Sequence, residues 1–195
     1  MDDEPLRFET PAAFAAWLEE HHASCDGIWL AFAKKGSGIA SVTYKEVLPI
    51  ALAHGWIDGQ VKRIDDAWYR QRWTPRRARS VWSKINRAAA EAMIERGEMK
   101  PAGLAEVERA KADGRWERAY DSPATAEVPG DLRVALDAEP AAAAFFAGLD
   151  SINRYAILHR IQDAKRAETR ASRIAKFVAM CSRGETVHPP RRAAR

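Results

Sequence analysis

The sequence has few of the residues that mark secreted, membrane-spanning or metal-binding proteins. Among its 195 residues are only two cysteines, Cys25 and Cys181, too few for a disulfide framework. No apolar run approaches the ~20 residues that cross a bilayer. The first ten residues are acidic, whereas a secretory signal would be basic and then apolar. We therefore expect a cytoplasmic protein without a transmembrane segment.

Motifs for metal, cofactor or nucleotide binding are also missing. The five histidines and two cysteines form no pair with metal-ligand spacing. The KKGSG segment at 34–38 lacks the glycine and lysine pattern of a phosphate-binding loop, which favours a simple turn. No nucleophile-elbow pattern surrounds Ser80 or Ser83. The sequence therefore predicts no metal, no cofactor and no motif-defined catalytic residue.

Positive charge is abundant, and it is unevenly distributed. Residues 54–87 contain 9 basic and 3 acidic side chains, a net of +6, and four of the seven tryptophans. Residues 88–153 contain 7 basic and 13 acidic side chains, a net of −6. Arginine head groups resist burial, whereas tryptophan rings favour it. The 54–87 segment therefore either folds as a tryptophan-anchored element with a solvated basic face or forms a site for an anion.

Apolar periodicity and capping residues predict an α+β fold. The N-terminal half should run α-β-α-β-β-α around a small antiparallel or mixed sheet of about three strands. The expected helices are 10–22, 43–53, 83–97 and 101–112, and the expected strands are 27–34, 56–64 and 68–73. An all-helical module should follow, with helices at 131–138, 140–148, 151–164 and 168–183. We expect domains at 1–120 and 131–190, a linker at 121–130 that contains two prolines, and a disordered tail at 191–195.

Strand alternation sorts the side chains of the predicted hairpin into two faces. If the strands pair about Asp65–Ala67, one face is mostly apolar and looks like core: Ile57, Val61, Arg63, Tyr69, Gln71 and Trp73. The other is polar and mostly cationic: Asp58, Gln60, Lys62, Ile64, Trp68, Arg70 and Arg72. In this register Asp58 lies near Lys62 and Arg72, and a carboxylate held by cations has a lowered pKa.

Several long strings resemble the bacterial YdeI/OmpD-associated family, often labelled bacteriocin-protection. They are GWIDGQVKRIDD (55–66), QRWTPRRARSVWSKIN (71–86) and RIQDAKRAETRASRIAKFVAMCSRGETVHP (160–189). The KKGSG loop and the following VTYKE also fit, so the resemblance extends over nearly the whole chain. One departure is Ile39, where relatives tend to have a lysine. The resemblance implies a role in tolerance of antimicrobial peptides and, by the family name, a link to a porin of the cell envelope.

The hypothesis that we favour is a non-catalytic stress-tolerance factor that binds an anionic small molecule or protein partner through the basic hairpin and the segment after it. Charge-assisted bonds from arginine and stacking on tryptophan would provide the binding. The candidate ligand-binding residues are Trp56, Asp58, Gln60, Lys62, Trp68, Arg70, Arg72, Arg76, Arg79 and Trp82. A structural explanation stays open, in which Trp73 and Trp82 anchor the core and the arginines pair with the acidic middle segment.

Two alternative functions also remain open. One is an enzyme acting on a phosphorylated or carboxylated small molecule, with Asp58 as base and Arg70, Arg72 and Arg76 as anion clamps. It requires a pocket in which Asp58 and at least two of these arginines converge. The other is a nucleic-acid-binding protein, whose affinity would fall steeply with salt concentration.

Overall fold

A computed structural model describes residues 4–189 of the chain. It divides the protein into two compact units, Met1–Ala119 and Tyr120–Arg195. The first contains a three-stranded sheet and helices, and the second contains helices alone in its described part. This confirms the predicted α+β class. The predicted disordered tail, 191–195, lies outside the described residues, and the linker at 121–130 stays a prediction.

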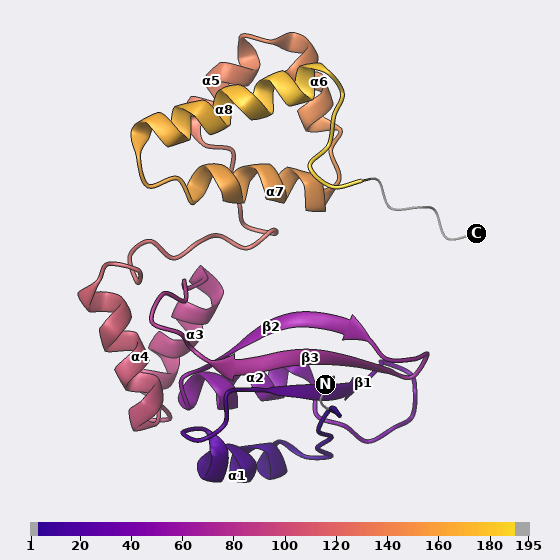
Figure 1. The fold of residues 1–195 in the computed structure, drawn as a ribbon, viewed down its shortest axis with the longest axis vertical. Helices are drawn as coiled ribbons and strands as arrows, with labels where there is room; N and C mark the ends of the chain where they lie inside the picture. Colours follow the sequence, from indigo (N-terminus) through magenta and orange to yellow (C-terminus); the bar gives the residue numbers. More distant parts are fainter. Residues whose placement is uncertain (1–3, 190–195) are drawn as a thin grey trace. The chain divides into compact units, whose positions relative to one another are not determined.

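The elements of the first unit follow the predicted order (Figure 1). Its helices are α1 (Pro11–His21), α2 (Tyr44–Ala53), α3 (Lys84–Glu95) and α4 (Pro101–Ala112), and its strands are β1 (Ile28–Ala33), β2 (Trp56–Arg63) and β3 (Trp68–Pro75). The sheet order is β1-β3-β2, and both strand pairs are antiparallel. The hairpin therefore contributes the central strand, β3, and β1 pairs with it along its other edge.

Local sequence signals explain where these helices begin. The hydroxyl of Thr10 accepts a hydrogen bond from the Ala13 amide at 3.2 Å, and Ser83 caps α3 in the same way through Asn86 at 3.1 Å. At the start of α2, the backbone amide of Thr43 donates to the Glu46 carboxylate at 2.8 Å. These side chains occupy the backbone groups that a helix leaves without partners at its ends.

The apolar face of the sheet packs against α1 and α2. Phe14 and Leu18 of α1, with Val47 and Ala51 of α2, form one buried cluster with Ile28, Leu30, Phe32, Trp56 and Trp73 of the strands. A second cluster of this unit contains Leu52, Trp82, Met93, Val107 and Trp116. Three of the four tryptophans of segment 54–87 are therefore fully buried, and only Trp68 is half-buried.

A β-bulge in β2 overturns part of the predicted alternation. Asp58 pairs with Trp73 and Val61 pairs with Gln71, so Gly59 and Gln60 together oppose the single residue Arg72. The extra residue reverses which face each earlier side chain of β2 occupies. The prediction was therefore wrong for Ile57 and Asp58. Asp58 lies on the face that the helices cover, and Ile57 lies on the opposite face.

The strand end beyond the bulge corrects a second detail. Val61 lies on the predicted face, level with Gln71, but its side chain is 56% exposed, and Ile64 is also exposed. Val61 is therefore not the core residue that alternation predicted.

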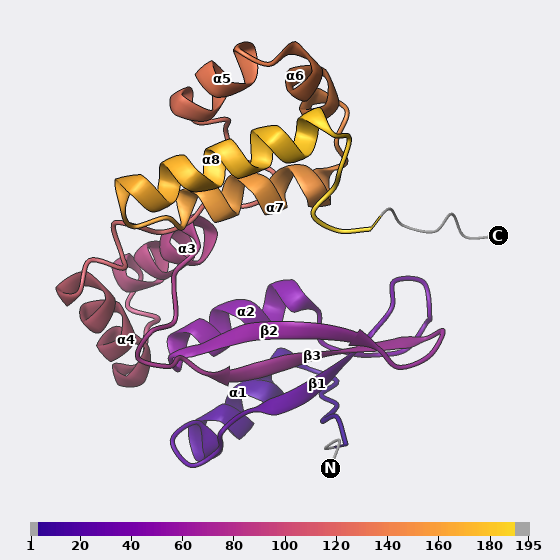
Figure 2. The ribbon, with the colours of Figure 1, turned by 45° about the horizontal axis from the view of Figure 1, so that its top comes forward.

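The described part of the second unit is built around four helices (Figure 2). Its helices are α5 (Gly130–Asp137), α6 (Pro140–Ala147), α7 (Ser151–Gln162) and α8 (Ala167–Ser182), close to the predicted ranges. Helices α5, α6 and α7 all contact α8. The core contains Leu132, Phe146, Ile157, Ile161, Phe177 and Val178. Arg170 of α8 donates two hydrogen bonds to Asp131 of α5, at 2.5 and 2.8 Å.

Membrane-spanning helices and metal-binding clusters are both absent from residues 4–189. Every helix in this range is too short or too polar to cross a membrane. The same residues contain no cluster of three or more histidine, cysteine, aspartate or glutamate side chains that could hold a metal ion.

Candidate functional site

The sheet face opposite α1 and α2 contains a cluster of cations around one tryptophan ring. The side-chain nitrogen of Lys62 lies 5.0 Å from the centre of the Trp29 ring. The guanidinium carbons of Arg70 and Arg72 lie 4.7 and 6.0 Å from the same centre. We call Trp29, Lys62, Trp68, Arg70 and Arg72 the cationic face. Cation–π contacts of this kind contribute about 0.5–1 kcal/mol each at exposed positions.

Strand register brings the members of the cationic face together. Trp29 of β1 pairs with Arg72 of β3, and Lys62 of β2 pairs with Arg70 of β3. Paired residues of antiparallel strands point to the same side of the sheet. Trp68 lies on this side as well, and the guanidinium of Arg7 covers its ring at 4.7 Å. Residues from all three strands therefore build the face.

The cations of this face remain accessible, whereas the ring beneath them is not. Lys62 is exposed, Arg70 and Arg72 are half-exposed, and Trp29 retains only 9% of its surface. Neither Lys62 nor Arg72 forms an ion pair with another residue in the range 4–189. The alkyl parts of the long side chains cover the ring while the charged ends stay in water. The result is a positively charged surface on a rigid sheet.

Asp58 lies on the opposite face, in a partly buried polar cluster. Its carboxylate accepts hydrogen bonds from the amide of Gln71 at 3.1 Å and from the Tyr44 hydroxyl at 3.4 Å. Burial raises the pKa of the Asp58 carboxyl, and these bonds and the charge of Arg76 oppose the effect only in part. The lowered pKa that we predicted for Asp58 is therefore wrong, because the bulge moves this side chain away from Lys62 and Arg72.

The remaining predicted site residues lie apart from the cationic face. Trp56 is fully buried in the core between the sheet and the helices. Arg76 is buried, and its guanidinium lies 3.5 Å from the centre of the Trp82 ring. Trp82 is itself buried, and its ring centre is 4.8 Å from that of Trp116. Gln60 is exposed in the bulge, and Arg79 is exposed in the turn before α3.

Asp58 does not converge with Arg70 and Arg72 in the way that the enzyme hypothesis requires. That hypothesis requires Asp58 and at least two of Arg70, Arg72 and Arg76 around one substrate, but the sheet separates the Asp58 carboxylate from the guanidiniums of Arg70 and Arg72. Of these three arginines, Arg76 is the one whose charge lowers the pKa of Asp58. Four of the ten predicted ligand-binding residues, Lys62, Trp68, Arg70 and Arg72, lie together. They form one cationic surface around the ring of Trp29.

Sequence reasoning missed two residues of this region. Trp29 is the centre of the cationic face, and Arg7 covers Trp68. The alternation of β1 places Trp29 on the face opposite Ile28, Leu30 and Phe32. The long side chains of Lys62, Arg70 and Arg72 cover that face at Trp29. The sequence signal for this residue is that Trp29 shares its strand face with the small residues Ala31 and Ala33, which leaves room for long cationic side chains over its ring.

Fold and site together define an α+β protein with a cationic, aromatic sheet face and a separate helical unit. The chain belongs to the family described as "Domain of unknown function (DUF8412)", whose model matches residues 6–106. Residues 125–184 match the family "Bacteriocin-protection, YdeI or OmpD-Associated", which confirms the predicted YdeI/OmpD-associated resemblance and suggests a protein of the bacteriocin-protection type. The strings at 55–66 and 71–86 fall in the first match. Searches of curated proteins and of solved structures find no match.

Proposed function

We propose that this protein is a cytoplasmic, non-catalytic factor for tolerance of antimicrobial peptides, and that it binds an acidic segment of a partner protein through the cationic face. The bacteriocin-protection match supports the biological role. Cys25 and Cys181 are both free thiols, which fits a reducing compartment. The single observation that supports the binding mode is the convergence of Lys62, Arg70 and Arg72 on the ring of Trp29.

The spacing of the cations favours an extended partner. Arg70 and Arg72 are two residues apart on β3, so their Cα atoms are separated by about 6.6–6.8 Å along the strand. An extended peptide with an acidic residue at every second position repeats at the same distance. Lys62 lies beside Arg70 on the neighbouring strand and adds a third positive charge. Exposed carboxylates of such a segment could therefore meet the cations in register.

The aromatic rings of the cationic face are covered by other side chains, which favours a protein partner over a nucleic acid. Single-stranded nucleic acids bind by stacking bases on exposed aromatic side chains in a basic groove. Here Trp29 is buried beneath its three cations, and Arg7 lies over Trp68. A base would have to displace these arginines before it could stack. The face therefore offers charge without an open ring.

Fluorescence anisotropy with defined probes tests the binding mode. The probe is a fluorescein-labelled peptide of five Glu-Ser repeats, compared with the same peptide in which glutamine replaces glutamate, at about 50 mM salt. We expect the acidic peptide to bind and the neutral one not to. Combined Lys62→Gln, Arg70→Gln and Arg72→Gln substitutions should weaken binding at least tenfold, because they remove the three charges that face the ligand.

A matched control separates this face from net charge. Lys165, Arg166 and Lys176 are exposed in the second unit, so their combined change to glutamine lowers the net charge equally and should leave binding unchanged. Equal weakening by both triple variants would overturn the proposal. So would tighter binding of a ten-residue thymidine oligonucleotide than of the acidic peptide, if the cationic-face variant abolishes it, since that result assigns the face to nucleic acid.

A further inference from the structure

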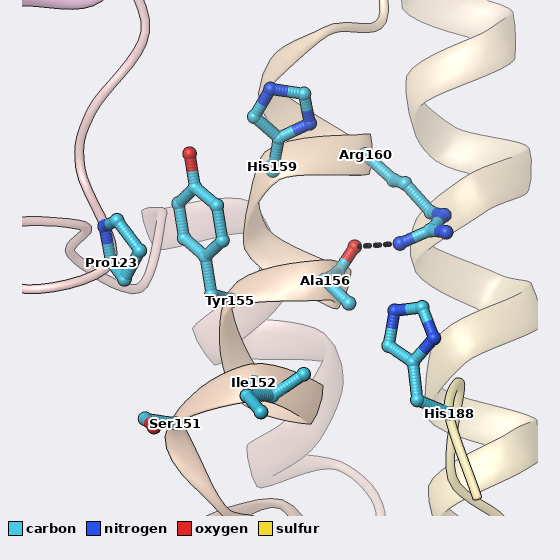
Figure 3. A pocket seen from close by; sticks show the side chains of 8 residues that line it. All are labelled: Pro123, Ser151, Ile152, Tyr155, Ala156, His159, Arg160 and His188. Carbon is cyan, nitrogen blue, oxygen red and sulfur yellow. Dashed lines mark hydrogen bonds between the residues drawn. The ribbon is translucent and has the colours of Figure 1, made fainter. Parts of the chain in front are cut away.

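The second unit contains a cavity of about 450 Å³ along α7, distinct from the cationic face. This volume lies within the range of about 300–1,000 Å³ that is usual for small-molecule sites. Figure 3 shows Pro123 and Tyr155 on one side of the lining and Arg160 and His188 on the other, with Ile152, Ala156 and His159 between them. The cavity thus has an apolar floor of Ile152 and Ala156, the aromatic rings of Tyr155 and His159, and the guanidinium of Arg160 on the other side.

Hydrogen bonds fix two of its walls in place. On the aromatic side, the Tyr155 hydroxyl donates to the backbone carbonyl of Asp121 at 2.8 Å, and the Gln162 amide donates to the Asp121 carboxylate at 2.9 Å. On the other side, the backbone amide of His188 donates to the side chain of Asn153 at 2.8 Å. Asn153 is only 3% exposed. A buried polar group therefore holds the segment after α8 against α7.

The polar groups of the cavity favour a negatively charged ligand. Its eight lining residues include Arg160, His159 and His188 but no aspartate or glutamate. One guanidinium nitrogen of Arg160 donates to the Ala156 carbonyl at 2.8 Å, and Arg160 forms no ion pair within residues 4–189. Its remaining N–H groups can donate to a carboxylate in the forked geometry that arginine favours.

The aromatic wall favours a flat ring. The ring of His159 lies 5.5 Å from that of Tyr155 and 5.2 Å from that of Tyr120, the latter edge to face. Such rings prefer offset or edge-to-face contacts with a further aromatic group. A ring placed over Ile152 and Ala156 could touch this wall while its charged substituent points to Arg160.

We propose that this cavity binds a small aromatic carboxylate, with the ring against Tyr155 and His159 and the carboxylate at Arg160. The site is independent of the cationic face, because its lining comes entirely from the second unit. Benzoate and its neutral counterpart benzamide, titrated into the full-length protein, are the probes. Two-dimensional ¹⁵N NMR should show benzoate shifting amide signals of residues 151–160 and of His188, with benzamide binding at least tenfold more weakly.

Three variants test the assignment. Arg160→Gln should weaken benzoate binding at least tenfold and leave benzamide unaffected. Ile152→Trp should block both probes, because Ile152 is 45% exposed on the cavity floor and the larger ring fills the space. Arg133→Gln is the matched control, since Arg133 is also exposed and donates only to a backbone carbonyl among the described residues; it should bind as the unmodified chain does. Equal affinity for benzoate and benzamide, benzoate shifts confined to other residues, or an Arg160→Gln protein that binds benzoate normally would each overturn the proposal.

Discussion

Asp58 and Trp73 are cross-strand neighbours on the helix-covered face of the sheet. A carboxylate in this position is unusual, because most residues of this face are buried and apolar, although Tyr44 and Gln71 donate hydrogen bonds to it. The cause is the two-residue bulge at Gly59 and Gln60, which reverses the alternation of β2. The same bulge leaves the opposite face free of carboxylates from β2, so the cations around Trp29 dominate it.

The raised pKa of Asp58 makes a prediction about stability. A carboxyl whose pKa is raised in the folded state binds more protons there than in the unfolded state. Its contribution to stability is therefore present at low pH and is lost as the pH rises through the folded pKa. Asp58→Asn removes the buried charge, so we expect this variant to melt at a higher temperature than the unmodified chain at pH 7. The difference should shrink when the pH approaches 3.8, the ordinary value for aspartate.

Asp113 in the same unit provides a control of opposite sign. Hydrogen bonds from Arg115 lower the pKa of the Asp113 carboxyl, so its stabilising effect is present near neutral pH and is lost as the pH falls. Asp113→Asn should therefore melt at a lower temperature at pH 7. Thermal melts of both variants between pH 7 and about pH 3.8 check whether each substitution raises or lowers the melting temperature as predicted. An Asp58→Asn protein that is less stable than the unmodified chain at pH 7 would show that the charged form of Asp58 is needed in the fold.

Deletion of Gln60 tests the register assigned to the bulge. Without the extra residue, Gly59 alone would oppose Arg72, and Asp58 and Val61 would keep their partners Trp73 and Gln71. Trp56 would then stay in the core, where it is fully buried, so we expect the free energy of urea unfolding to change by no more than about 1 kcal/mol. Gln60→Ala keeps the bulge and removes only an exposed side chain, so it is the matched control and should be nearly neutral. A loss of about 3–5 kcal/mol on deletion, the cost of removing a tryptophan from a core, would contradict this register.

The structure shows which features the sequence determines locally. Thr10, Ser83 and the Thr43–Glu46 pair sit at the helix starts that they predicted, because a cap acts within four residues. Faces on β3 were also predictable, since Arg70 and Arg72 alternate with Tyr69, Gln71 and Trp73 without interruption. The position of Asp58 was not predictable, because Gly59 and Gln60 can be accommodated either in a regular strand or in a bulge. Pairing with β3 and packing against the helices select the bulged strand.

The centre of the candidate site depends on pairing between distant segments. Trp29 meets Arg72 because β1 pairs with β3 across more than 40 residues of sequence, and no local pattern specifies that register. Two residues of the predicted site, Arg76 and Trp82, are buried for a related reason. Their segment follows β3 and enters a second core with α4, which residue composition alone does not reveal.

Trp82 can be assigned to the core or to a ligand site by its effect on stability. Its side chain is 1% exposed and packs between Arg76 and Trp116. Trp82→Ala should therefore lower the free energy of unfolding by about 3–5 kcal/mol. The matched change Trp68→Ala removes a half-buried ring from the cationic face and should cost much less. A loss below about 1 kcal/mol for Trp82→Ala, measured by urea unfolding, would return Trp82 to the list of candidate ligand contacts.

The most direct test of the proposed function is survival of bacteriocin-treated cells. A sensitive bacterial strain would produce the unmodified protein, the Lys62→Gln/Arg70→Gln/Arg72→Gln variant, or the Lys165→Gln/Arg166→Gln/Lys176→Gln control, and melting temperatures of the purified proteins would be compared. We predict that the unmodified protein and the control protect the cells. The cationic-face variant should fail to protect, although its melting temperature stays nearly unchanged. Full protection by that variant would contradict the proposal that the cationic face is the functional surface.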